Sequence, residues 1–73
     1  MSKTETLYTK IAGESASVNV EFVTVDSAWL SMRVASREDA LLACYCYAPQ
    51  KTKIERAANG QYLVVVYKSR AAA

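Results

Sequence analysis

The sequence predicts an α+β domain in which a single α-helix packs on one face of an antiparallel sheet of four or five strands. Three observations predict this class. Several stretches alternate apolar and polar residues with a period of two, which is typical of strands that bury one face. Another stretch opens with a helix-capping pattern and continues with apolar residues at helical spacing. Finally, an Asn59-Gly60 pair, a strong signal for a tight hairpin turn, separates two more strand-like stretches.

Three strands are expected before the helix. The alternation is clearest over residues 18–22 and 30–34, and a shorter version covers residues 7–11. Asp26-Ser27 suits a turn, because both side chains can hydrogen-bond to nearby backbone groups. A rival interpretation places one helix from Asp26 to Ala48, but the alternation over residues 30–34 argues against it. The side chains expected to share the core face of these strands are Val18, Val20, Phe22, Leu30, Met32 and Val34.

The helix is expected to begin after Ser36. The segment Ser36-Arg37-Glu38-Asp39 matches the [ST]-x-x-[DE] capping pattern and puts acidic residues in the first turn, where the helix dipole favours them. Pro49 is expected to end the helix. The apolar stripe expected to face the sheet consists of Ala40, Leu41, Cys44, Tyr45 and Ala48.

A hairpin is expected after the helix, with strands over residues 52–57 and 61–68. A two-residue type I′ turn at Asn59-Gly60 would pair Ala58 with Gln61, and therefore Ile54 with Val65. This register predicts a core face made of Ile54, Leu63, Val65 and Tyr67. It predicts a second face carrying Tyr62, Val64 and Val66 beside Lys53, Glu55 and Lys68.

Length and composition indicate one small domain. The chain has 73 residues, of which 52% are hydrophobic, and its net charge is +2. Residues 1–4 and 69–73 are expected to be loose ends. The longest apolar run, residues 63–67, is too short to cross a bilayer, and the opening residues contain no apolar signal-peptide core. We therefore expect a cytoplasmic protein without membrane contacts.

Neither a catalytic residue, nor a metal, nor a cofactor is expected. The sequence contains no histidine, which is the commonest general base and metal ligand. On a helix, Cys44 and Cys46 would point about 200° apart, so both thiolates could not reach one ion. These cysteines are expected to be reduced structural thiols. With Gly13 and Gly60 as its only glycines, the chain also lacks a glycine-rich phosphate loop.

The second face of the sheet is the predicted binding site, because one helix cannot cover two faces. Apolar surface rimmed by charge is typical of interaction sites, and Tyr, Trp and Arg often anchor them. In the alternative interpretation, the sheet curls and buries these side chains in its own core. The predicted site is centred on Tyr62, Val64 and Val66, with Trp29 and Tyr8 nearby and Lys53, Arg33 and Lys68 at the rim.

The predicted function is the binding of a larger protein by a non-enzymatic regulator or inhibitor. Small size and the lack of catalytic chemistry are typical of phage and mobile-element products that inhibit host defence, such as anti-CRISPR proteins. A homodimer is a further candidate for the partner.

A nucleic-acid-binding module is the alternative function. Tyr8, Trp29 and Tyr62 could stack on bases, while Lys10, Arg33, Lys53 and Lys68 could meet phosphates. Two acidic residues on the same predicted face, Glu21 and Glu55, count against this alternative.

Overall fold

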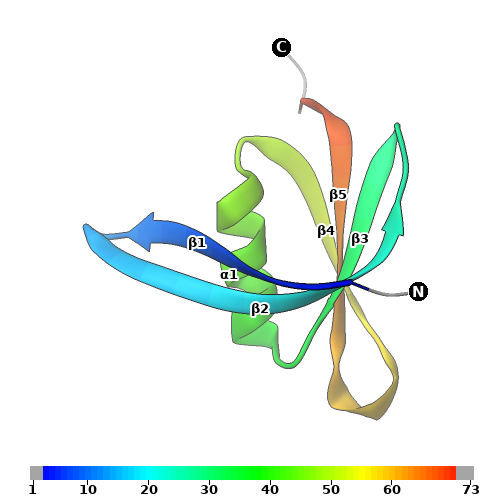
Figure 1. Cartoon of the computed structure of the whole chain (residues 1–73), viewed down its shortest axis with the longest axis horizontal. Helices are drawn as coiled ribbons and strands as arrows, with labels where there is room; N and C mark the ends of the chain where they lie inside the picture. The colour runs from blue at the N-terminus through cyan, green and yellow to red at the C-terminus, as the bar shows by residue number, and fades with distance from the viewer. Residues whose placement is uncertain (1–2, 71–73) are drawn as a thin grey trace.

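The described part of the chain forms one five-stranded antiparallel sheet with a single α-helix against one face (Figure 1). The computed structural model describes residues 3–70. Its elements are β1 (Lys3–Ile11), β2 (Glu14–Val25), β3 (Trp29–Val34), α1 (Arg37–Tyr47), β4 (Gln50–Arg56) and β5 (Tyr62–Arg70), and the strand order in the sheet is β1-β2-β3-β5-β4. The predicted α+β class and element order are confirmed. The rival helix from Asp26 to Ala48 is wrong, because β3 occupies its first half.

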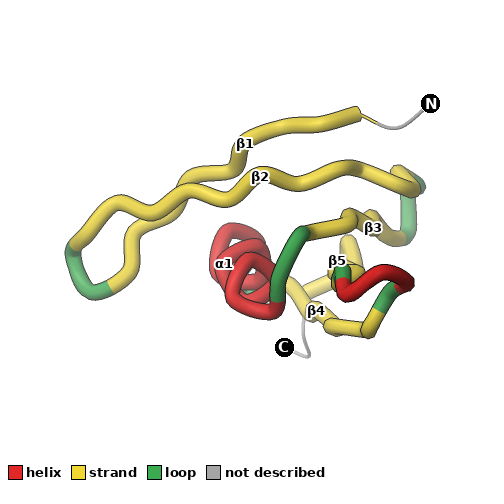
Figure 2. The backbone as a smooth tube through the Cα atoms, turned by 90° about the horizontal axis from the view of Figure 1, so that it is seen from below, coloured by secondary structure: helices red, strands yellow, loops and turns green. Residues whose placement is uncertain are grey.

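The sheet bends around the helix. Figure 2 shows β1 and β2 above α1, with β3, β5 and β4 beside it, so that the helix lies on the concave side. The β1–β2 hairpin projects beyond the helix as a long arm. Its tip is a two-residue turn at Ala12-Gly13, where both residues have positive φ and Ile11 pairs with Glu14. Sequence analysis did not predict this turn, although glycine at the second position favours it.

The ends of the sheet extend further than expected. Lys3 and Thr4 belong to β1, and Ser69 and Arg70 belong to β5. The prediction of loose ends is therefore wrong at these four positions. The rest of the predicted loose ends, residues 1–2 and 71–73, lies outside the described residues.

Helix α1 begins as predicted. Ser36 is extended, with φ −148° and ψ 168°, and the Asp39 backbone N–H donates a hydrogen bond of 3.2 Å to its Oγ. Glu38 and Asp39 occupy the first turn, where the helix dipole favours negative charge. The capping pattern thus fixes the point at which the chain leaves β3 and turns along the sheet.

We expect Ser36→Ala to lower the free energy of unfolding by about 1 kcal/mol, because it leaves the Asp39 N–H without its acceptor. Urea denaturation followed by circular dichroism measures this loss. Ser36→Thr, which keeps the hydroxyl, is the matched control and should lose much less. Equal losses in both variants would contradict a capping role.

The helix presents a different stripe to the sheet from the one expected. Ala40 and Ala43 are fully buried, whereas Leu41 and Tyr45 remain 45% and 58% exposed. Small side chains at the contact let the helix lie close to the sheet. The predicted stripe of Ala40, Leu41, Cys44, Tyr45 and Ala48 is therefore wrong except at its first member and at the half-buried Cys44.

The core lies between α1 and the concave face of the sheet. Met32 at the centre of β3 is fully buried, and Val64 beside it on β5 is equally inaccessible. The six core residues expected from the strands before the helix all belong to this core cluster or pack against it. The buried members of the cluster are Val18, Val20, Leu30, Met32, Val34, Ala40, Ala43, Val64 and Val66, with Leu7, Phe22, Ile54 and Tyr62 among the half-buried residues around them.

The β4–β5 hairpin has the predicted turn but not the predicted register. Asn59 and Gly60 have φ of 61° and 75°, and the Gln61 N–H donates to the Ala58 carbonyl, as a type I′ turn requires. However, the Gln61 carbonyl accepts a 2.8 Å bond from the Ala57 N–H, so Ala58 is an extra residue between the turn and the strand ladder.

This one-residue bulge exchanges the two faces of β5. Ile54 pairs with Val64 instead of the predicted Val65. A slip of one residue moves every side chain of a strand to the other face. Val64 and Val66 therefore lie under the helix, and Leu63, Val65 and Tyr67 lie on the opposite face, contrary to the prediction.

Candidate functional site: the uncovered face of the sheet

The convex face of the sheet, opposite α1, carries a group of apolar side chains from its two central strands. The register places Trp29 directly opposite Tyr67, Ser31 opposite Val65, and Arg33 opposite Leu63. Lys53 and Glu55 of β4 lie on the other side of Val65 and Leu63. We call Trp29, Leu63, Val65 and Tyr67 the open-face patch.

Burial in the open-face patch decreases from its centre to its edge. Val65 is 5% exposed and Ser31 is 7% exposed, although no second layer formed by residues 3–70 covers this face. Neighbouring side chains supply the cover. At the edge, Trp29 remains 43% exposed, and the Lys51 ammonium lies 5.5 Å from the centroid of the Tyr67 ring. The patch therefore has a packed aliphatic centre and accessible aromatic edges.

Charged side chains beside the open-face patch form ion pairs with one another. Arg33 Nη1 donates to Glu21 Oε1 at 3.1 Å, and Lys53 Nζ lies 3.5 Å from Glu55 Oε2. All four side chains are partly exposed, so each pair contributes little to stability. The ion pairs matter more for the charge of this surface, because Glu21 and Glu55 offset the positive charges of Arg33 and Lys53.

The structure brings together three of the eight predicted site residues. Trp29, Arg33 and Lys53 lie on the convex face, as expected. Tyr8 is 77% exposed and points to the same side of the sheet. However, it lies out on the β1–β2 arm, four residues along β1 from Thr4, the residue that pairs with Glu21. Tyr8 is therefore remote from Trp29.

The other four predicted site residues are misplaced. Val64 and Val66 are 0% and 1% exposed in the core, so their predicted surface position is wrong. Tyr62 is half-buried on the helix side. Lys68 lines a depression near Tyr47, also on the helix side. The bulge at Ala58 accounts for all four of these β5 residues, at positions 62, 64, 66 and 68, since it reverses the direction in which they point.

The sequence did not predict that Leu63, Val65 and Tyr67 lie on the convex face. The segment from Tyr62 to Tyr67 is apolar at every position, so its pattern suits either face equally well. A strand that is apolar on both sides, in a sheet with one helix, must place one apolar set on the face opposite the helix, but this signal does not say which set.

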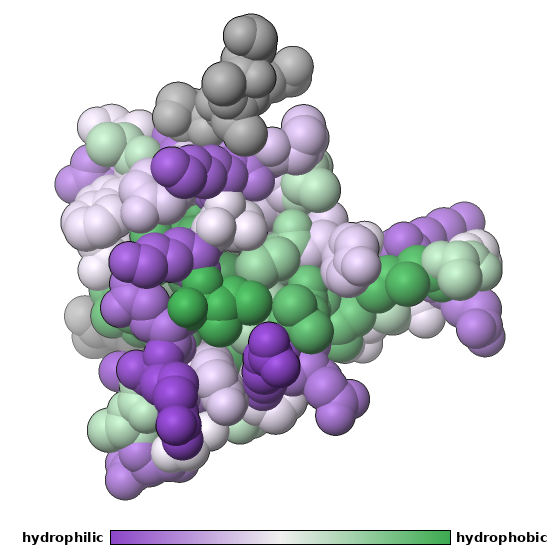
Figure 3. All heavy atoms as spheres, turned by 180° about the vertical axis from the view of Figure 1, so that it is seen from behind, coloured by the Kyte–Doolittle hydropathy of each residue, from purple (hydrophilic) through white to green (hydrophobic). Residues whose placement is uncertain are grey.

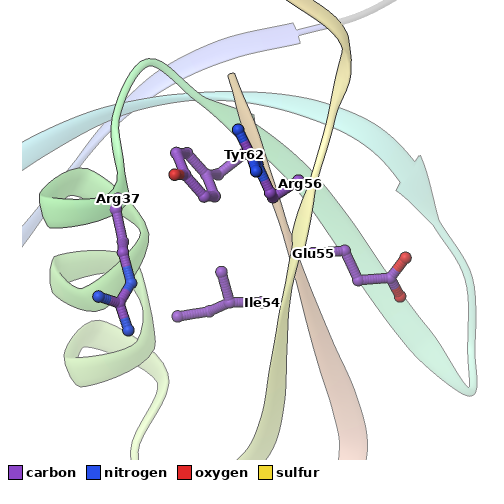
Figure 4. Close-up of a pocket in the computed structure, with 5 residues that line it drawn as sticks. All are labelled: Arg37, Ile54, Glu55, Arg56 and Tyr62. Atoms are coloured by element: carbon purple, nitrogen blue, oxygen red, sulfur yellow. The ribbon is translucent and has the colours of Figure 1, made fainter. Parts of the chain in front are cut away.

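Two hollows lie between α1 and β4. At one end, Arg37, Ile54, Arg56 and Tyr62 line a hollow of about 490 Å³, with Ile54 pointing toward the helix and Glu55 pointing away (Figure 4). At the other end, a hollow of about 270 Å³ is lined by Leu41, Cys44, Tyr45, Ala48, Gln50 and Thr52. Seen from behind the view of Figure 1, apolar residues form a band across the middle of the molecule (Figure 3).

The two cysteines are free thiols on α1, each half-buried. Burial raises the pKa of the Cys46 thiol, which keeps it protonated and weakly nucleophilic near neutral pH. Burial also raises the pKa of the neighbouring Tyr47 hydroxyl, with smaller contributions from Cys46 and Glu5. Within residues 3–70, no three His, Cys, Asp or Glu side chains cluster as metal ligands would.

No helix in the described part of the chain has the length and apolar character needed to cross a membrane. Comparisons with protein-family models, with curated proteins and with solved structures find no match for this chain. The geometry of the convex face is therefore the basis for interpreting its function.

Proposed function

We propose that this chain is a non-enzymatic binding protein that docks the open-face patch onto a larger protein. One observation carries the proposal: Trp29, Leu63, Val65 and Tyr67 lie side by side on a sheet face that no other element of residues 3–70 covers. The accessible part of this patch is aromatic, since Trp29 is 43% exposed and Tyr67 is half-buried, and Trp and Tyr rimmed by charge are frequent binding anchors. The face is convex, which suits docking onto another macromolecule better than enclosing a small ligand.

The rim charges favour a protein over a nucleic acid. A nucleic-acid surface needs cations that are available to phosphates. Here Arg33 is ion-paired with Glu21, and Lys53 with Glu55. Paired charges of alternating sign suit the polar rim of a protein interface.

The proposed role is that of a regulator or inhibitor acting in the cytoplasm. A small domain with an accessible aromatic edge can occupy a functional surface of a much larger target. An inhibitor of host defence encoded by a phage or mobile element, of the anti-CRISPR type, is the specific form that we propose. The small size of the domain formed by residues 3–70 and the apolar group on its convex face support this form.

The dependence of binding on salt tests the class of partner. We expect a protein captured from host extract to bind with an affinity that changes little between low and high salt, because apolar contacts dominate. Trp29 is the sole tryptophan of the chain, so a shift of its fluorescence emission reports directly on the open-face patch. Binding to nucleic acid that weakens steeply with salt, without a captured protein, would contradict the proposal.

A further inference from the structure

We propose that two copies of this chain pair antiparallel along β4, with Ile54 of each copy opposite Ile54 of the other. The pairing would join two five-stranded sheets into one continuous sheet. It uses the edge of the sheet, whereas the proposed docking surface uses its convex face, so the two proposals stand or fall separately.

Within residues 3–70, strand β4 ends the sheet on one side and is hydrogen-bonded to no strand other than β5. The Ala57 N–H points to β5, where it donates to the Gln61 carbonyl. Backbone groups of successive strand residues point in opposite directions, so those of Thr52, Ile54 and Arg56 point outward. This outward row of donors and acceptors is available to another strand.

The charges on β4 select a second copy as the occupant and fix its register. Pairing centred on Ile54 puts Lys53 of each copy directly opposite Glu55 of the other, which gives two cross-strand pairs of opposite charge. Centring one residue earlier would pair Lys51 with Glu55 twice but would also put Lys53 opposite Lys53, and centring one residue later would put Glu55 opposite Glu55. Of these three registers, only the one centred on Ile54 pairs opposite charges without also opposing like charges.

The helix side of β4 supports the same occupant. Leu41 and Tyr45 are exposed on α1 and flank the hollow that Thr52 lines from β4. Ile54 lines the adjoining hollow, pointing toward the helix (Figure 4). A second copy paired with β4 would bring its own helix to this side of the joint sheet. A single interface would then cover both the free edge of β4 and the exposed side chains of Leu41 and Tyr45 on α1.

The other end strand lacks this complementarity. On β1, Glu5 lies on the helix side, and Lys10 lies on the convex side. These two charges cannot face each other in any strand pairing. A register that pairs Lys3 with Glu5 would be centred on Thr4 and would leave most of β1 without a partner.

Charge reversal tests the dimer and its register. We expect the chain to sediment at twice its 8.0 kDa mass at high concentration and to dissociate on dilution. Lys53→Glu and Glu55→Lys should each raise the dimer dissociation constant about tenfold or more, because like charges then face each other twice. Mixing these two single variants should restore a dimer that contains one copy of each. The double variant Lys53→Glu/Glu55→Lys should dimerise like the natural sequence.

Lys10→Glu on β1 is the matched control, and it should leave dimerisation unchanged. All these side chains are exposed, so melting temperatures verify that each variant is folded. A natural chain that remains monomeric at every concentration would overturn the proposal, and the lysines of β4 would then act to keep the edge from pairing. A dimer that tolerates both single reversals would overturn the β4 register.

Discussion

Val64→Asp is expected to unfold the protein. Val64 is fully buried beneath α1, between Met32 of β3 and Ile54 of β4. A carboxylate at this point would lose its hydration among the apolar side chains of the core cluster. The cost of about 4 kcal/mol or more is comparable to the whole stability of a domain of this size. Thermal unfolding followed by circular dichroism should show a collapsed or absent transition.

Leu63→Asp is the matched comparison, because it makes the same change one residue earlier on the same strand. Leu63 lies half-buried on the convex face between Arg33 and Glu55, so the new carboxylate stays partly hydrated, and Arg33 offsets its repulsion from Glu55. We expect this variant to fold with a moderately lower melting temperature. The opposite result, a folded Val64→Asp and an unfolded Leu63→Asp, would mean that the hairpin has the bulge-free register.

The sequence predicts the turn of this hairpin but not its register, for a physical reason. Asn59-Gly60 needs positive φ at two successive residues, and few dipeptides tolerate that conformation. The bulge at Ala58 needs no special residue, so it leaves no local signal. Hydrophobic alternation normally reveals a register, but residues 62–67 are apolar at every position.

The stripe of α1 that faces the sheet could not be predicted for a similar reason. Its capping box is specific, and the structure confirms Ser36 as the N-cap. After Asp39, however, residues 40–48 are all apolar or weakly polar, so several stripes fit helical spacing. The distance between helix and sheet decides among them, and it favours Ala40 and Ala43. Sequence periodicity does not contain that distance.

Candidate-site residues on β3 were predicted better than those on β5. Trp29 and Arg33 alternate with Leu30, Met32 and Val34, so their direction follows from one unbroken pattern. Lys53 was also placed correctly, since a lysine on a half-covered strand points to solvent. The prediction that one helix leaves one face uncovered is confirmed as geometry. Which β5 residues lie on that face depends on the bulge at Ala58.

The role of the uncovered face is tested most directly at Trp29. If the open-face patch is the docking surface, Trp29→Ala should weaken partner binding by about 2 kcal/mol, or roughly thirtyfold, because buried aromatic anchors dominate binding energy. Trp29 is 43% exposed at the end of β3, so the melting temperature should change little. Calorimetric titration of the captured partner, with a melt of the same sample, gives both quantities.

Tyr8→Ala provides the control for this measurement. Tyr8 is an exposed aromatic residue on the same side of the sheet, but it lies out on the β1–β2 arm, away from the open-face patch. Its removal should leave both binding and stability near their original values. If Tyr8→Ala instead costs as much binding as Trp29→Ala, the contact must extend along the arm. If only Tyr8→Ala weakens binding, the docking surface is the arm and the open-face patch is not involved.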